Sequence, residues 1–261
     1  MKVFSKLKYF ITRELSKDYF AIFFRDRRRH LKFINDLSKK YSKIEDLIKI
    51  DNYKIPNIFI SKIKKTDMKD FLSFGVEFHI DFEYKISREF NKTFNFFEID
   101  ERSIDWFNQN FKNKNNLLIH NFGVSNKNDT VDCFGSLNKS FSSSMNQTFI
   151  KDHLNTFSFI NKAKVYRMNK ILEIINKKNI DFLKLDIEGE AIKVLKDTIE
   201  LNIYPKIILC ELERPKNMRF ESYKKQVISL LVNIEEFYDI IVSYRNDSYN
   251  AYAIEFWMLK R

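Results

Sequence analysis

The sequence predicts an α/β protein with a mostly parallel central sheet, one antiparallel strand near the C-terminal end, and a helical extension at the N-terminus. Beyond about residue 68, short β-rich runs alternate with amphipathic stretches, and this alternation is typical of a parallel sheet covered by helices. The last two β-rich runs have only a short polar segment between them, so they predict a closing antiparallel pair. In residues 2–50, by contrast, apolar residues recur every three or four positions, as they do in helices.

The first half of the sheet region predicts three strands and two helices. Phe71–Val76 and Thr93–Ile99 are rich in aromatic and β-branched residues, which favour strands, and the segment between them up to Phe90 suits a helix. Glu101–Phe111 begins with an acidic residue and carries its large aromatic residues on one side, which predicts a helix. The short apolar run Leu117–Asn121 predicts a third strand.

A polar region leads into the second half. Thr130–Phe134 predicts a short strand, whereas Gly135–Asn161 is rich in Ser and Asn and predicts a long irregular connection of the kind that forms lids or binding loops. Met168–Lys178 predicts a helix. Ile180–Asp186 is an apolar run bounded by acids and predicts a buried strand. Glu188–Leu201 has acids at its start and apolar residues along one face, which is typical of a helix.

The chain closes with a strand, a helix and a pair of antiparallel strands. These elements are predicted, in order, at Lys206–Leu212, at 221–236, and at Tyr238–Tyr244 with Ala251–Leu259 around the polar segment Arg245–Asn250.

The positive charge of the chain is concentrated near its N-terminus. The net charge is +11; residues 1–65 hold 18 Lys and Arg against seven Asp and Glu, whereas residues 66–261 hold 28 of each. Since Pro56 marks a break in the helical pattern, we predict a basic helical extension over residues 1–65 and a second domain over residues 66–261. The densest basic segment, Arg25–His30, follows the apolar run Tyr19–Phe24. Such a helix suits an anionic membrane surface or a polyanionic substrate, or it is simply a solvated helix face.

Composition excludes several classes of protein. With 44% hydrophobic residues the chain can form a core, and its four glycines do not occur as G-x-G-x-x-G or G-x-x-x-x-G-K, so a glycine-rich phosphate loop is excluded. Cys133 and Cys210 lie 77 positions apart and indicate neither a disulfide framework nor a zinc site. Apolar runs are too short to span a bilayer, and RNA-binding signatures are absent, which argues against nucleic acid. We predict a cytoplasmic protein, or one at the inner face of the membrane.

Acidic or amide side chains follow most of the predicted parallel strands. They are Glu77 after Gly75, Glu98 with Asp100, Asn121, Asp186 with Glu188, and Glu211 with Glu213. Parallel strands bring their carboxyl ends to one edge, where open α/β sheets bind ligands at the switch in strand order. Carboxylates there repel phosphate groups but suit a ligand with hydroxyls and a positive centre, such as S-adenosylmethionine. Capping of the following helices is the alternative interpretation of each acid taken singly.

One segment resembles a known family. Asp181-Phe-Leu-Lys-Leu-Asp-Ile-Glu-Gly189, continuing as Glu-Ala-Ile-Lys-Val-Leu195, resembles the signature of FkbM-type methyltransferases, a branch of the class I, S-adenosylmethionine-dependent enzymes. The supporting motifs, in order, are Leu72–Val76 with Asp81–Glu83, Phe96–Asp100, Asn121–Asn126, Ser142–Ser144 and Ile207–Glu211. The resemblance spans about residues 70–215 and implies a Rossmann-like class I methyltransferase sheet; it does not account for the basic extension.

The resemblance also implies roles for individual residues. Gly75 would let the backbone approach the methionine moiety of the cofactor, and Glu98 would accept hydrogen bonds from the ribose hydroxyls. Asn121 and Phe122 would flank the adenine, and Asp186 would lie beside the methyl group or the methionine amine. The full set expected to bind the cofactor is Gly75, Glu77, Asp81, Glu98, Asp100, Asn121, Phe122 and Asp186.

Two departures from the family pattern stand out. The family usually places a small residue and then Glu after its D-x-E-G, whereas here Glu190 precedes Ala191, which shifts the acid by roughly 100° around the helix. In the first loop, Glu77, Phe78 and His79 stand where relatives tend to have Gly and acidic residues. In one interpretation Glu77 supplies the carboxylate that relatives place in this loop. In the other, the chain binds the cofactor weakly, and it is then a non-catalytic member of the family.

Methyl transfer to a hydroxyl requires a group that accepts the proton. The candidates are Asp186, Glu188, Glu211 and His79, with His120 as a further histidine whose ordinary pKa near 6.5 suits this role. A divalent ion held by the oxygens of Asp186, Glu211 and Glu213 is an alternative, but nothing in the spacing demands it, so we predict no metal site.

Two functions follow from the sequence. The resemblance implies an O-methyltransferase that acts on a sugar hydroxyl, in a nucleotide-activated sugar or in a surface glycan such as a capsule or surface polysaccharide. The basic extension would then contact a diphosphate or an anionic membrane. The alternative is a non-catalytic, methyltransferase-like module that binds a membrane surface or nucleic acid through its basic helices. An RNA methyltransferase is less favoured, because the Asn-Pro-Pro-aromatic motif used on base amines is absent.

Overall fold

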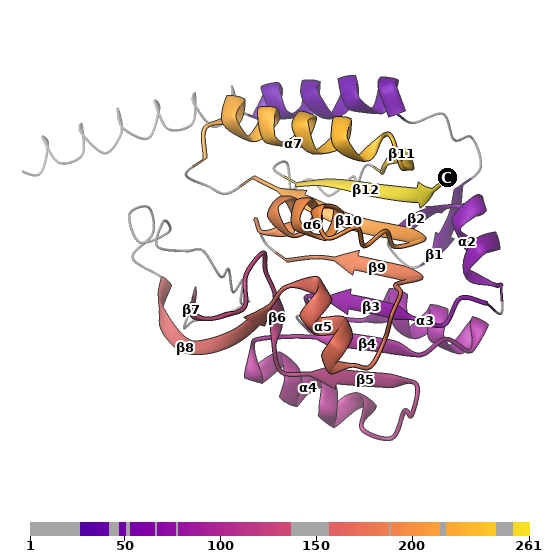
Figure 1. Ribbon diagram of the computed structural model, residues 1–261, viewed down its shortest axis with the longest axis vertical. Helices are drawn as coiled ribbons and strands as arrows, with labels where there is room; N and C mark the ends of the chain where they lie inside the picture. Colours follow the sequence, from indigo (N-terminus) through magenta and orange to yellow (C-terminus); the bar gives the residue numbers. More distant parts are fainter. Residues whose placement is uncertain are drawn as a thin grey trace, which may run out of the picture.

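The computed structural model describes residues 27–41, 47–50, 53–65, 67–76, 78–136, 157–187, 189–214, 218–243 and 253–261. Its centre is a seven-stranded sheet in the order β11-β12-β10-β9-β3-β4-β5 (Figure 1). Five neighbouring strands are parallel: β3 (Phe71–Phe74), β4 (Phe94–Phe97), β5 (Leu117–His120), β9 (Phe182–Leu185) and β10 (Ile207–Glu213). The predicted parallel sheet is therefore confirmed.

The closing strand pair is also confirmed. β12 (Ala253–Lys260) runs antiparallel to β10, and β11 (Tyr238–Ser243) runs antiparallel to β12 at the outer edge. The sheet thus has a single reversed strand, β12, inserted between two strands of the common direction.

The chain changes direction across the sheet beside β3. From β3 it adds β4 and then β5 on one side, and it later returns to place β9 and then β10 on the other side. Phe74 at the end of β3 is paired with Leu185 at the end of β9. Since ligands of open α/β sheets bind beyond the carboxyl ends of the strands at such a switch point, this seam marks the candidate site.

Helices cover both faces of the sheet, because successive strand residues point to opposite faces. Phe71 belongs to one core together with residues of α2 (Asn57–Ile63), α3 (Asp81–Phe90) and α4 (Glu101–Phe111). Its neighbour Leu72 belongs to the other core, which includes residues of α5 (Met168–Ile174), α6 (Ala191–Glu200) and α7 (Phe220–Ile234). The first of these two faces is called the α3 face below.

The helix over residues 27–41 packs alongside α7 (Figure 1). Its side chains Phe33, Ile34 and Leu37 are buried in the same core as the α7 residues, and the rings of Phe33 and Phe220 meet edge to face at 6.0 Å. A helix in the N-terminal region is thus confirmed. The division at residue 65 stays a prediction, although this helix shares a core with the second segment.

The helical prediction over residues 2–50 is wrong at its C-terminal end, where the structure has strands. β1 (Leu47–Ile50) and β2 (Tyr53–Pro56) form an antiparallel hairpin. The physical reason lies in the pattern: Ile48-Lys49-Ile50 and Tyr53-Lys54-Ile55 each place a lysine between two apolar residues, and Asp51-Asn52, residue types favoured in turns, stand between the strands. The segment 1–26 of the predicted extension lies outside the described residues.

The irregular connection predicted over Gly135–Asn161 is corrected at both ends. β7 (Asp129–Ser136) and β8 (Phe157–Tyr166) pair antiparallel, and β6 (Gly123–Val124) joins β8 to complete a three-stranded sheet. In the second half of β8, Ala163 and Val165 are buried while Lys162 and Lys164 are exposed, the alternation of a half-buried strand. Residues 137–156 lie outside the described part.

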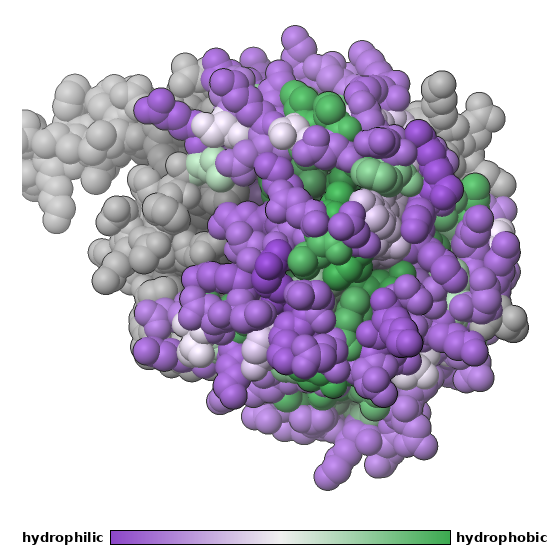
Figure 2. All heavy atoms as spheres, in the orientation of Figure 1, coloured by the Kyte–Doolittle hydropathy of each residue, from purple (hydrophilic) through white to green (hydrophobic). Residues whose placement is uncertain are grey.

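Exposed apolar side chains are scattered over the described part of the surface. Figure 2 shows one face that is mostly hydrophilic, with a narrow hydrophobic band down its middle. The exposed large apolar side chains lie on several different elements, at Ile58, Phe78, Leu118, Ile174, Ile228 and Val232. Within the described ranges, no helix combines the length and the apolar character needed to cross a bilayer.

The burial of the N-terminal helix can be tested by truncating one of its core side chains. Phe33→Ala should lower the free energy of unfolding by about 3 kcal/mol, because it removes a buried aromatic ring and leaves a cavity. Urea unfolding measures the change, with the exposed Lys39→Ala as the control. A loss below about 0.5 kcal/mol, the range of ordinary surface substitutions, would show that this helix does not share the core.

Candidate functional site

Three backbone hydrogen bonds join the ends of four neighbouring strands at and beside the switch point. The N–H of Asp186, just after β9, donates to the carbonyl of Phe74 at 3.0 Å, and the N–H of Gly75, just after β3, donates to the carbonyl of Phe97 at 3.2 Å. One strand further, the N–H of Glu98 donates to the carbonyl of His120 at 3.1 Å. The residues that follow β9, β3 and β4 therefore lie at one edge in a fixed register.

Gly75 is held against β9 by its backbone. It has φ +84°, a conformation that favours glycine, and a Cβ atom at this position would lie 1.9 Å from the carbonyl oxygen of Asp186. The sequence predicts that Gly75 approaches the cofactor; that role stays a prediction. The structure adds an independent requirement for glycine, because any side chain here would push β3 and β9 apart.

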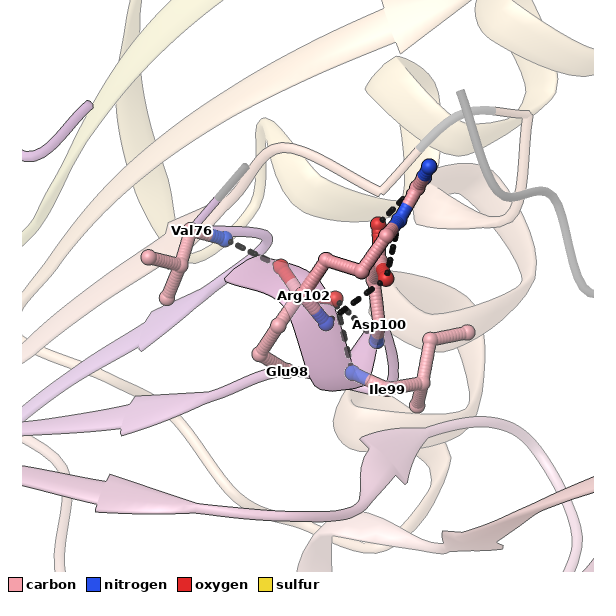
Figure 3. A network of polar contacts seen from close by, with 5 residues as sticks. All are labelled: Val76, Glu98, Ile99, Asp100 and Arg102. Atoms are coloured by element: carbon pink, nitrogen blue, oxygen red, sulfur yellow. Dashed lines mark hydrogen bonds and ion pairs between the residues drawn. The ribbon is translucent and has the colours of Figure 1, made fainter. Parts of the chain in front are cut away.

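The carboxylate of Glu98 accepts three backbone hydrogen bonds (Figure 3). Oε2 accepts from the N–H of Val76 at 2.8 Å, and Oε1 accepts from the N–H groups of Ile99 at 2.7 Å and Asp100 at 2.9 Å. The side chain is buried, at 6% exposure. Because Val76 directly follows Gly75, Glu98 is fixed next to the Gly75–Asp186 contact, and the two acids lie on the same edge of the sheet.

Asp100 caps helix α4. Its carboxylate accepts from the backbone N–H of Arg102 at 3.0 Å and forms an ion pair with the guanidinium of Arg102 at 3.1 Å (Figure 3). These bonds account for an acid at this position, and a role in cofactor binding stays a prediction.

Nearby, burial raises the pKa of the Cys133 thiol to about 11, so this residue, which packs with Ile99, stays protonated.

The end of β5 contributes aromatic rings. Phe97 stacks on Phe74 at 4.4 Å and on His120 at 4.9 Å, and its ring lies 5.3 Å from that of Phe122. The Nε2 atom of His120 lies 3.1 Å from Oδ1 of Asn95, and burial lowers the pKa of His120, so its ring is neutral at pH 7. This arrangement makes His120 part of an aromatic wall, and the expected adenine residue Phe122 belongs to the same wall.

The end of β9 carries a buried charge cluster on the α3 face. The Nζ atom of Lys184 lies 2.9 Å from Oε1 of Glu83 and 3.6 Å from Oδ2 of Asp186, and the Ser73 hydroxyl donates to Glu83 at 2.7 Å. Sequence reasoning missed Glu83 and Lys184 as site residues. The available signal was a lysine inside the apolar run Phe-Leu-Lys-Leu, since a lysine is almost never fully buried unless it is paired.

The end of β10 adds further acids to this face. Cys210 of β10 is the register partner of Leu185 on β9, so the residues that follow them, Glu211 and Asp186, lie level with each other. On its other side, Glu211 pairs with Glu255 of β12. Glu211 is half-buried and remains a candidate general base. Among the described residues, no group of three or more Asp, Glu, His or Cys side chains is arranged to hold a metal ion. The alternative site formed by Asp186, Glu211 and Glu213 is thus not found.

The remaining predicted site residues are exposed or lie outside the described residues. His79 and Asp81 are exposed, and Asp81 lies in the first turn of α3, where its charge favours the helix. Asn121 is exposed after β5. Glu77 and Glu188 lie outside the described residues.

Glu190 explains one departure from the family pattern. It is buried at the start of α6 and forms an ion pair with Lys193 at 2.9 Å. The predicted helix over Glu188–Leu201 therefore begins later, at Ala191, since Gly189 has φ +77° and cannot be part of a helix. The shifted acid thus serves the helix start.

The strand order and the switch point define a Rossmann-like α/β domain, and its acid-edged carboxyl ends at β3 and β9 form a candidate ligand site. The chain belongs to the FkbM methyltransferase family, because the family model "Methyltransferase FkbM domain" matches residues 73–244. This confirms the resemblance seen in the sequence. Among curated protein sequences, none matches the chain.

Several solved methyltransferase-related structures are similar to the chain at low identity. Fibrillarin of Aeropyrum pernix with natively bound S-adenosyl-L-methionine has 9% identity and a TM-score of 0.44, over 74% of this chain and 67% of that chain. An rRNA methylase from Streptococcus thermophilus has 6% identity and a TM-score of 0.42, over 78% and 94%. The fibrillarin pre-rRNA processing protein of Methanococcus jannaschii has 10% identity and a TM-score of 0.45, over 83% and 82%. Likenesses this distant transfer neither a substrate nor a cofactor.

The requirement for glycine at position 75 can be tested by adding a single methyl group. Gly75→Ala should lower the free energy of unfolding by about 2 to 4 kcal/mol, since it combines a left-handed backbone conformation with overpacking. Asn91→Ala is the matched control: Asn91 has φ +51° at the end of α3 and is exposed, so it should lose only about 1 kcal/mol. Equal losses in urea unfolding would contradict the contact with Asp186.

Proposed function

We propose that the protein is an S-adenosylmethionine-dependent O-methyltransferase acting on a sugar hydroxyl, in a nucleotide-activated sugar or a surface glycan. The observation that carries the proposal is the position of Glu98 and Asp186 on either side of Gly75, at the switch point of a sheet that belongs to the FkbM methyltransferase family. The sugar acceptor and the hydroxyl preference rest on the family resemblance.

The residues at the switch point fit S-adenosylmethionine by their chemistry. The ribose has hydroxyls to donate, and Glu98 presents a carboxylate whose two oxygens are oriented by three N–H groups. The methionine end carries an ammonium and a sulfonium, and Asp186 presents a carboxylate with 25% of its side chain exposed. The adenine suits a flat aromatic ring, which the half-buried Phe122 provides, with the buried ring of Phe97 packed against it at 5.3 Å.

Within this proposal the protein binds, orients and accepts a proton. The bound cofactor would supply a methyl group that its sulfonium already activates. Glu98 would hold the ribose, Asn121 and Phe122 would hold the adenine, and Asp186 would hold the methionine end. Holding the cofactor in this way would fix the direction of its methyl group toward the acceptor. Asp186 and Glu211, level with each other on the α3 face, are the favoured general bases; Glu188 and the exposed His79 stay candidates.

The basic N-terminal region would serve an anionic partner. On the described helix, Arg28, Arg29 and Lys32 are exposed, and cations on one helix attract a diphosphate or an anionic lipid surface. We therefore propose a cytoplasmic enzyme with peripheral contact to the inner face of the membrane. The structure adds no observation in favour of a non-catalytic module.

Cofactor binding can be tested at Glu98. Glu98→Gln should weaken S-adenosylmethionine binding at least tenfold, because hydrogen bonds to a charged acceptor are worth about 1.5 to 3 kcal/mol. Calorimetric titration gives the Kd, and the exposed neighbour Glu101→Gln is the matched control. For the unaltered protein, a hundredfold excess of ligand over Kd should add about 2.7 kcal/mol of stability. No binding and no thermal shift would contradict the proposal.

The reaction can be tested by following a labelled methyl group. With tritiated S-adenosylmethionine and nucleotide-activated sugars or glycan acceptors, label should appear in a sugar product. Asp186→Asn should abolish this transfer, because the variant keeps the size of the side chain but loses its charge. The exposed Asp239→Asn on β11 should transfer normally. Label in RNA but not in sugar would show that the acceptor class is wrong.

A further inference from the structure

The buried pair of Lys184 and Glu83 is not explained by stability. Lys184 is 3% exposed and Glu83 1% exposed, and removing two charges from water costs several kcal/mol for each ion. Apolar residues of similar volume often stabilise a core equally well or better. A charged pair at this depth is therefore weak evidence of added stability, and its contacts point to another role.

The geometry links this pair to Asp186. Lys184 and Asp186 are two residues apart on β9, so their side chains share the α3 face, and Ser73 is the register neighbour of Lys184 on β3. Glu83 reaches this face from α3 and accepts from both Ser73 and Lys184 through Oε1. The ammonium of Lys184 is thereby anchored on one side, while its other side faces Oδ2 of Asp186 at 3.6 Å.

Asp186 is held at two points. Its backbone N–H donates to Phe74, which fixes the main chain, and the ammonium of Lys184 attracts one carboxylate oxygen toward the interior. A quarter of the side chain remains exposed at the edge of the sheet. Glu83, Lys184 and Asp186 together carry one net negative charge, and that charge is nearest the surface at Asp186.

We propose that Lys184, anchored by Glu83, is a positioning residue that sets the direction of the Asp186 carboxylate toward a cationic ligand. This inference rests on the proposed function, in which that ligand is the methionine end of S-adenosylmethionine. Preorganisation of this kind lowers the cost of ordering a side chain when the ligand binds. Because Glu83 belongs to α3, which follows the Gly75 loop, the direction of the Asp186 carboxylate also depends on the position of α3.

The test removes the buried pair without leaving a lone charge. In the double variant Glu83→Gln/Lys184→Met, both charges are gone, Asp186 keeps its own, and the amide oxygen introduced at position 83 can still accept from Ser73. We expect a melting temperature close to that of the unaltered protein and a Kd for S-adenosylmethionine raised at least tenfold. Calorimetric titration and thermal unfolding are measured on the same full-length samples.

The matched control is another buried lysine. Lys92 is 5% exposed, and its ammonium donates to the carbonyls of Lys65 and Met68 at 2.6 and 3.0 Å, far from the carboxyl ends of the strands. Lys92→Met should lower the melting temperature and leave the Kd within twofold. A double variant that binds within twofold of the unaltered protein would overturn the positioning role alone. An unaltered protein that does not bind would overturn the proposed function, and this inference with it.

Discussion

The close approach of Gly75 to the carbonyl of Asp186 sets the geometry of the whole carboxyl edge. With no side chain at position 75, β3 and β9 remain paired up to Phe74 and Leu185, and the loop after β3 can turn across the edge. That turn brings the N–H of Val76 to the carboxylate of Glu98. The absence of a side chain at position 75 thus lets one loop contact the backbone of Asp186 and the carboxylate of Glu98 at the candidate site.

On β9, one face of the sheet carries apolar core residues and the other carries charged residues of the candidate site. Along β9, Leu183 and Leu185 enter the apolar core beneath α5, α6 and α7, whereas Lys184 and Asp186 lie on the α3 face. The strand period of two makes this division automatic. The amino-terminal half of the α3 face is nevertheless apolar, with Phe182 packed in an aromatic core. Along β9, charged side chains therefore occur on this face only near the carboxyl edge, where a ligand would reach them.

The sequence predicted the parallel sheet and most helices because those elements follow local patterns. Helix α4 was predicted at both ends, since Glu101 places an acid at its start and aromatic residues mark one side; the structure adds Asp100 as its cap. The hairpin β1–β2 was missed because a helix pattern upstream was extended into Leu47–Ile50, where only Ile48-Lys49-Ile50 alternates. The pair Glu83–Lys184 was missed for a different reason: its partners lie 101 positions apart, and only the pairing of β3 with β9 and the packing of α3 bring them together.

Two acids at one edge would repel each other unless each were stabilised separately, and the structure does this by different means. Glu98 is surrounded by backbone N–H groups, which stabilise its charge with dipoles and fix both oxygens. Asp186 faces a full positive charge on Lys184, which is itself shared with Glu83. Neither contact cancels the charge of its acid, because dipoles carry no net charge and the ammonium of Lys184 is shared by two carboxylates. A ligand with hydroxyls at one end and positive charge at the other matches this edge in both respects, whereas an anionic group would be repelled by it.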